Sequence, residues 1–162
     1  MKNIIDPMVS IFKTEIIGNV QIREFCTIRN STLGIGCKIY ERVSIKKSKI
    51  GEGSDINAGT YIENANIGRS VQIAPNCIIV GVTHNFSPEG VDHEDVFMRI
   101  AIGDGAWIGA GSIIMPGVKI GQGSVIGAGA IVKMDVPDGH VYIGTPFQSQ
   151  YRCYPISPTI HS

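Results

Sequence analysis

The chain has 162 residues, enough for one domain with a buried core, and its 14 basic and 14 acidic side chains balance to a net charge of zero. This balance argues against non-specific nucleic-acid binding, which depends on clustered positive charge. No apolar stretch approaches the roughly 18 residues of a membrane span, and Asp6 and Pro7 interrupt the segment where a signal peptide would stay apolar, so the sequence predicts a cytoplasmic protein.

Residues 1–10 precede a repeat and are expected to cap one of its ends. From residue 11 onward, large aliphatic residues recur at steps of five, six and six residues, so that equivalent positions lie 17 residues apart. The series is Ile11, Ile16, Ile22, Ile28, Leu33, Ile39, Ile45, Ile50, Ile56, Ile62, Ile67, Ile73 and Ile79. After a gap it resumes at steps of six as Ile102, Ile108, Ile114, Ile120, Ile126 and Val132.

This period fits neither a helix, with spacings of three and four, nor an ordinary strand, which alternates by two. It predicts short strands joined by bends, three to each coil, with coils stacked in parallel about 4.8 Å apart. A second series of small or β-branched residues follows four positions after the aliphatic one in the six-residue turns: Val20, Cys26, Cys37, Val43, Ser54, Thr60, Val71, Cys77, Ala106, Ser112, Val118, Ser124, Ala130 and Val136. The sequence therefore predicts an all-β solenoid of about six coils over residues 11–137, with both series pointing inward.

Glycine directly follows the aliphatic residue in many turns, at Gly34, Gly51, Gly68, Gly103, Gly109, Gly121 and Gly127, and we expect a positive φ there. Three of the four cysteines belong to the small inward series, and Cys153 lies in an irregular tail, residues 138–162. Without paired spacing or a CxxC motif, neither a disulfide nor a metal site is expected.

Residues 80–101 interrupt the repeat and are interpreted as an inserted loop with Gly81, Pro88 and Gly90. A regular solenoid wall is flat and cannot surround a small molecule, whereas a long loop on a rigid scaffold commonly carries function. The loop also contains two of the four histidines, His84 and His93.

The segment "IGDGAWIGAGSIIMPGVKIGQGSVIGAGAIVKMDVP", Ile102–Pro137, resembles the C-terminal coils of the hexapeptide-repeat acyltransferases, and "GTP" at Gly144–Pro146 resembles the element that follows them. The resemblance implies a left-handed parallel β-helix and a homotrimer with acetyl-CoA and acceptor between neighbouring prisms. "TH" at Thr83–His84 resembles the branch that acetylates hydroxyls of sugars and, in some members, of antibiotics.

By this resemblance, His84 is the general base that removes the proton of an acceptor hydroxyl as it attacks the acetyl thioester. Histidine suits this role near neutral pH, because its ordinary pKa is about 6.5. His93 and Asn85 are expected to bind the acceptor. His93 is flanked by Asp92, Glu94 and Asp95, so a solvated acidic loop tip is the other interpretation.

On the cofactor side, the resemblance implies that acetyl-CoA lies along the prism near Trp107, Ala110, Ala128 and Lys133, with no metal ion. The family often has Thr-Lys before "DVP", where this chain has Lys133–Met134, and a basic residue after the "GTP" element, where it has Phe147–Gln148. Arg152 is a substitute for that basic residue.

Three alternatives stay open: N-acetylation of an amino sugar or nucleotide-linked amino sugar, antibiotic acetylation, and a non-catalytic scaffold. The γ-class carbonic anhydrases share the prism but need two histidines separated by four residues, and that arrangement is absent because successive histidines here lie 9, 47 and 21 residues apart. The basic cluster of Lys38, Arg42, Lys46, Lys47 and Lys49 is either a solvated face or a patch for a phosphorylated acceptor.

Overall fold

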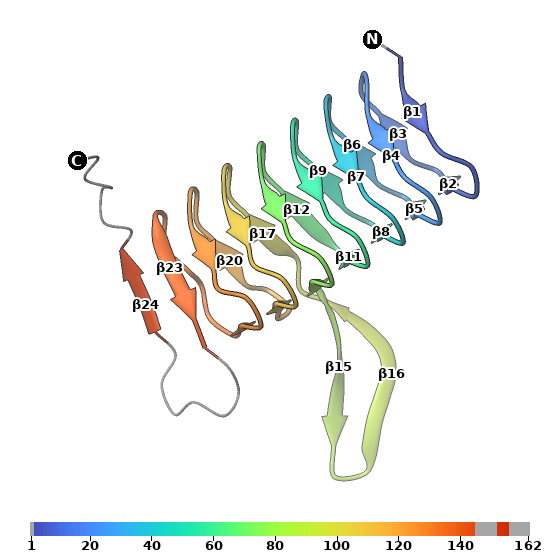
Figure 1. Cartoon of the computed structure of the whole chain (residues 1–162). Coiled ribbons are helices and arrows are strands. Elements are labelled where there is room, and N and C mark those ends of the chain that lie inside the picture. Colours follow the sequence, from blue (N-terminus) through green and yellow to red (C-terminus); the bar gives the residue numbers. More distant parts are fainter. Residues whose placement is uncertain (1, 145–151, 156–162) are drawn as a thin grey trace, which may run out of the picture.

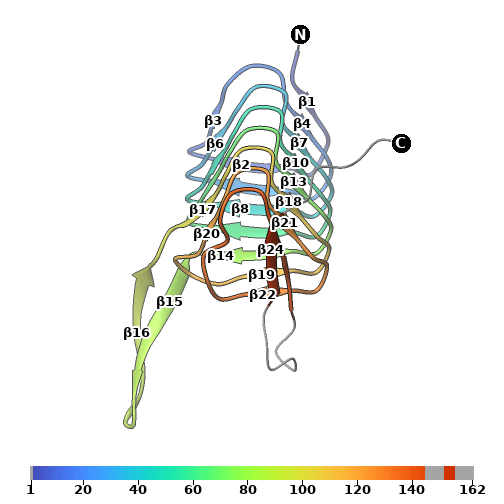
Figure 2. The same cartoon turned by 90° about the vertical axis from the view of Figure 1, so that its left-hand side faces the viewer.

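The computed structural model describes residues 2–144 and 152–155, and these ranges contain strands but no helix. The strands form three parallel sheets that are the walls of a prism, and the chain passes from one wall to the next at every bend (Figures 1 and 2). The fold is a left-handed parallel β-helix, so the predicted fold class is confirmed. Among the described residues no helix could cross a membrane.

The first wall contains eight parallel strands: β1 (Ile4–Ile5), β4 (Gln21–Ile22), β7 (Lys38–Ile39), β10 (Asp55–Ile56), β13 (Gln72–Ile73), β18 (Trp107–Ile108), β21 (Val125–Ile126) and β23 (His140–Ile143). The solenoid thus has more turns than the six expected, because β1 and β23 lie outside the aliphatic series yet pair with β4 and β21. A further strand, β24 (Arg152–Pro155), pairs antiparallel with β23. Cys153 therefore belongs to a strand and not to an irregular tail.

The second wall consists of β2 (Ser10–Phe12), β5 (Thr27–Arg29), β8 (Ser44–Lys46), β11 (Tyr61–Glu63), β14 (Ile78–Val80), β19 (Ile113–Ile114) and β22 (Ile131–Val132). The third wall consists of β3 (Glu15–Ile16), β6 (Thr32–Leu33), β9 (Lys49–Ile50), β12 (Ala65–Ile67), β17 (Ile100–Ile102) and β20 (Lys119–Ile120). The described residues do not include Pro146, Phe147, Gln148 or His161.

The core consists of columns of equivalent side chains. Ile62 is paired with Ile45 on one side and with Ile79 on the other, so residues 17 positions apart lie directly over one another. Every member of both inward series is buried except Ile11 and Ile16, which belong to the first full coil. The predicted core is therefore confirmed.

One buried column was not predicted. Ser31, Ser48, Ala65 and Ile100 occupy equivalent positions at the start of third-wall strands, and all four are buried. The Ser31 hydroxyl accepts a hydrogen bond from the Ser48 amide at 3.2 Å, and the Ser48 hydroxyl accepts one from the Ala65 amide at 3.0 Å. These bonds satisfy polar groups that would otherwise be buried without partners.

The expected positive φ at the glycines that follow an aliphatic residue was wrong. The positive φ occurs two residues later, for example at Gly36 (74°) and Gly53 (67°). At Gly51, an added Cβ would lie 2.3 Å from the carbonyl oxygen of Gly68 on the next coil. Glycine is required there because the stacked backbones approach too closely for any side chain.

Candidate active site

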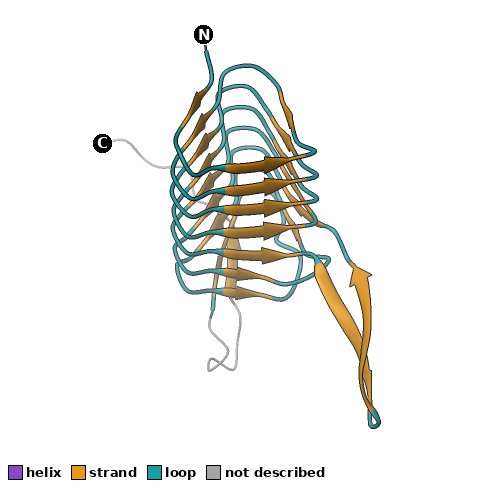
Figure 3. Ribbon diagram, turned by 90° about the vertical axis from the view of Figure 1, so that its right-hand side faces the viewer, coloured by secondary structure: helices purple, strands orange, loops and turns teal. Residues whose placement is uncertain are grey.

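The interruption of the repeat forms an antiparallel hairpin that projects from the corner between the second and third walls (Figure 3). Its strands are β15 (Val82–Ser87) and β16 (Gly90–Phe97), and residues 88 and 89 form the turn. At its base, the Met98 amide donates a hydrogen bond to the Gly81 carbonyl at 2.9 Å. The prism then resumes, because Ile100 takes the position over Ala65.

Gly81 marks the point where the chain leaves the prism. A Cβ at this position would lie 2.5 Å from the carbonyl oxygen of Asn64 and 2.7 Å from that of Met98. Glycine is therefore required at position 81, because the returning chain and the neighbouring coil leave no room for a side chain there.

The side chain of His84 is fixed by the opposite strand of the hairpin. Its Nδ1 lies 3.2 Å from the carbonyl oxygen of Glu94, which can only accept a hydrogen bond, so Nδ1 carries the hydrogen. In the neutral ring, Nε2 then has the free lone pair. Nε2 lies 3.9 Å from a carboxylate oxygen of Asp95, which supplies a counter-ion once the ring is protonated. The His84 side chain is about half exposed, at 46%.

The predicted acceptor residues also lie on the hairpin. Asn85 falls at the register irregularity between His84 and Phe86, and it lines a surface cavity of about 380 Å³ with residues of the tip. His93 is exposed and lies in the stretch of β16 where the register shifts, two residues before Asp95, the partner of His84. The structure thus brings all three predicted residues onto one element.

The predicted cofactor residues lie elsewhere on the chain. Ala110 and Ala128 are stacked at the corner between the first and second walls, where the amide of Gly129 donates a hydrogen bond to the Ala110 carbonyl at 2.8 Å. Trp107 lies half-exposed in β18 on the first wall. Lys133 follows β22 at the corner that also carries the hairpin. Within one chain, the width of the second wall therefore separates His84 from Ala110 and Ala128.

Two contributors to the site were missed from the sequence. The carbonyl of Glu94 and the carboxylate of Asp95 contact His84, although they were interpreted only as part of an acidic tip. The available signal was the turn-forming segment Pro88–Gly90 between two runs that contain β-branched and aromatic residues, which is typical of a hairpin. Among residues 2–144 and 152–155, no group of three His, Cys, Asp or Glu side chains is arranged to hold a metal ion.

Sequence comparison connects this architecture to known transferases. The profile of the family described as bacterial transferase hexapeptide (six repeats) matches residues 99–133. The bifunctional protein GlmU of Synechococcus sp. (strain RCC307) is 32% identical over 139 residues, which cover 85% of this chain and 29% of that protein. The chain therefore spans less than a third of the length of this curated relative.

Two solved structures are similar to about three quarters of the chain. A maltose O-acetyltransferase from Clostridium difficile 630 is 28% identical with a TM-score of 0.64, over 78% of this chain and 67% of that one. A hexapeptide-repeat acetyltransferase from Vibrio cholerae O1 biovar eltor, complexed with acetyl coenzyme A, is 27% identical with a TM-score of 0.67, over 74% of this chain and 67% of that one. With the regular repeat and the three-walled β-helix, these matches show that the chain carries the hexapeptide repeat of this bacterial transferase family.

Proposed function

We propose that the protein transfers an acetyl group from acetyl-CoA to a hydroxyl of a sugar or sugar-containing acceptor, with His84 as the general base. The observation that carries the proposal is the hydrogen bond from His84 Nδ1 to the Glu94 carbonyl, which leaves Nε2 to accept a proton. The similarity to a solved maltose O-acetyltransferase supports a sugar hydroxyl as the acceptor group.

The chemistry requires one proton to move twice. As the acceptor oxygen forms a bond to the thioester carbon, Nε2 of His84 removes the hydroxyl proton. The carbon–sulfur bond then breaks, and the imidazolium returns the proton to the departing CoA sulfur. The Asp95 carboxylate stabilises the charged ring between these two steps, and the Glu94 carbonyl keeps its orientation.

The acetyl-CoA arm has a suitable surface at the corner of Ala110 and Ala128. The adjacent Gly111 and Gly129 face open space, since an added Cβ meets no atom within 4 Å at either position. Small side chains let an extended chain approach the backbone amides of these turns. Trp107 and Lys133 are the further side chains that we assign to the cofactor. Acetyl-CoA bound to the solved Vibrio cholerae acetyltransferase supports this choice of cosubstrate.

A homotrimer would complete the site. In one chain, His84 and the Ala110–Ala128 corner lie at opposite edges of the second wall, so a neighbouring copy has to bring one beside the other. The hairpin also exposes apolar side chains, with Phe86 at 85% and Val91 at 58%. Such side chains on a projecting element favour contact with a second copy of the chain.

The test is a screen of acetyl-CoA turnover against neutral sugars, sugar phosphates, nucleotide-linked sugars, amino sugars and aminoglycosides, with the product mass measured. We expect an acetylated product whose new bond is cleaved by mild base, as an ester is and an amide is not. If only amine acceptors are turned over, the N-acetyltransferase alternative replaces this one. If no acceptor is turned over, the scaffold alternative replaces it.

A further inference from the structure

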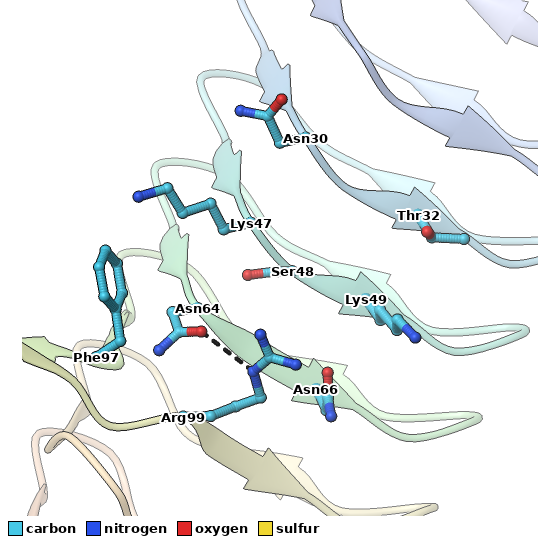
Figure 4. Close-up of a pocket in the computed structure, with 9 residues that line it drawn as sticks. All are labelled: Asn30, Thr32, Lys47, Ser48, Lys49, Asn64, Asn66, Phe97 and Arg99. Atoms are coloured by element: carbon cyan, nitrogen blue, oxygen red, sulfur yellow. Dashed lines mark hydrogen bonds between the residues drawn. The ribbon is translucent and has the colours of Figure 1, made fainter.

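A cationic pocket lies beside the base of the hairpin, on the third wall and its corner with the second wall (Figure 4). It has a volume of about 500 Å³, and Lys47, Lys49, Arg99, Asn66 and Phe97 are among the residues that line it. Lys47 and Lys49 come from one coil, whereas Arg99 comes from the segment that returns from the hairpin.

The pocket has positive charge without compensation. Its lining contains three cations, amide and hydroxyl side chains and one aromatic ring, but no carboxylate. Within residues 2–144 and 152–155, the ion pairs involve Arg23, Lys38, Arg69 and His84 and none of the three pocket cations. Charged donors that line one pocket without a counter-ion match the chemistry of a phosphate group.

Arg99 is held in place by a buried amide. The Arg99 Nε donates a hydrogen bond to Asn64 Oδ1 at 3.1 Å, while Asn64 Nδ2 donates to the Gly81 carbonyl at 2.7 Å. Asn64 is only 3% exposed, so this anchor is part of the buried prism. The two Nη groups make no hydrogen bond in the described part of the chain, and they remain available to a ligand.

The pocket borders the face of the hairpin that carries His84. Phe97 lines the pocket, and the ammonium of Lys47 lies 4.3 Å from its ring centroid. Phe97 and Asp95 lie on one face of β16, and Asp95 is directly paired with His84. Two residues along a strand span about 7 Å, so a ligand anchored at Phe97 could reach His84 with a second sugar-sized group.

We infer that this pocket binds the phosphate-bearing part of the acceptor, so that the acceptor is a phosphorylated or nucleotide-linked sugar whose free hydroxyl is presented to His84. The inference rests on the proposed function, whose acceptor class it narrows. The basic run of the sequence does not act as one patch: Lys38 pairs with Asp55 on the first wall at 3.7 Å, and Lys46 donates to the Tyr61 hydroxyl at 2.8 Å.

The experiment is a calorimetric titration of the full chain with uridine diphosphate and with inorganic pyrophosphate, each in the presence of saturating CoA, and separately with CoA alone. The variants are Arg99→Gln and Lys49→Gln, and the matched control is Lys38→Gln on the first wall. Because a charge-assisted hydrogen bond is lost, each pocket variant should bind uridine diphosphate about tenfold more weakly. The control should bind it as the wild type does, and no variant should change CoA affinity.

The inference is overturned if uridine diphosphate and pyrophosphate do not bind, or if the pocket variants bind them as tightly as the wild type. It is also overturned if CoA affinity falls instead, since the pocket would then hold the phosphates of the cosubstrate. A change in the mass measured by light scattering would make the pocket a subunit contact. The two proposals can fail separately, because binding is measured without turnover. If neutral sugars are turned over and diphosphates do not bind, only the assignment of the pocket is refuted. If diphosphates bind and His84→Ala keeps full activity, only the assignment of the base is refuted.

Discussion

The ring of His84 and the backbone carbonyl of Glu94 are joined across the hairpin by a 3.2 Å contact from Nδ1. This contact determines the tautomer of the neutral ring and leaves Nε2 as the basic nitrogen. The carbonyl belongs to the opposite strand, ten residues away in sequence, so the pairing of β15 with β16 creates the contact. A histidine on an unpaired loop would have no such constraint.

Replacement of His84 by alanine should lower kcat by about 10²–10⁴-fold, the usual contribution of a general base. The affinity for acetyl-CoA should change little, because the residues assigned to the cosubstrate lie at other positions. His93→Ala is the matched control and should act more weakly, mainly by raising the KM for the acceptor. Steady-state kinetics would contradict the assignment if His84→Ala kept nearly full rate while His93→Ala abolished activity.

Light scattering at micromolar concentration should give about three chain masses, as the shared site requires. Phe86→Ser should shift the protein toward the monomer and reduce activity in parallel, because Phe86 is 85% exposed in the isolated chain. Met8→Ser, which changes an exposed residue in the first coil at the opposite end of the prism from the C-terminal coils, should have no effect on the mass. A stable and fully active monomer would refute both the trimer and the shared site.

Ile62→Ala should lower the free energy of unfolding by about 2–5 kcal/mol, because it opens a cavity between Ile45 and Ile79 in a fully buried column. Ile17→Ala, at a side chain that is 45% exposed, should cost much less. Urea unfolding at one fixed protein concentration would measure both, since oligomerisation makes stability depend on concentration. Equal losses for the two variants would contradict the assignment of the core.

Gly51→Ala and Gly123→Ala should distinguish two reasons for glycine in the turns, which are close contact with the next coil and a positive φ. At Gly51, the new Cβ meets the Gly68 carbonyl oxygen at 2.3 Å, so the loss should reach the upper end of the ~1–3 kcal/mol typical of overpacking. At Gly123, φ is 63° and the space is open, so the loss should be about 1 kcal/mol of backbone strain. A larger loss at Gly123 in thermal unfolding would reverse this order.

The buried thiols should weaken the fold at alkaline pH. Burial raises the pKa of Cys26, Cys37 and Cys77 above the ordinary value of 9.0. The folded state therefore holds these protons more tightly than the unfolded state, and this contribution to stability is complete below pH 9.0 and is lost as pH rises through the folded-state pKa values.

Urea midpoints measured from neutral pH to above pH 9.0 should therefore fall on the alkaline side. A variant with alanine at all three positions should show a smaller alkaline fall, although its stability at neutral pH is lower. An equal fall in both proteins would assign the pH dependence to other groups.

The amino-acid sequence was sufficient for the columns of the core. Inward residues such as Ile62 repeat every five or six positions, and the physical reason is local, since each short strand with its bend requires that number of residues. The same regularity located the insertion and its histidines. It did not reveal the Ser31–Ser48 column, because serine is not distinctive in a small inward position, and it assigned Gly51 to a bend when the cause is contact with the next coil.

The arrangement of the candidate site was decided only by the tertiary structure. Lys47 and Arg99 are 52 positions apart in the chain, yet both line one pocket, because the hairpin returns its second strand to the corner that it left. Lys46 and Lys47 are adjacent in sequence, yet Lys46 is the last residue of β8 on the second wall, whereas Lys47 lies at the corner and lines the pocket. The sequence by itself determined the period, the core and the position of the interruption, which depend on neighbours along the chain. The tautomer of His84 depends on a contact across the hairpin, and the anchoring of Arg99 by Asn64 depends on a contact between the hairpin and the prism. No local pattern encodes either contact.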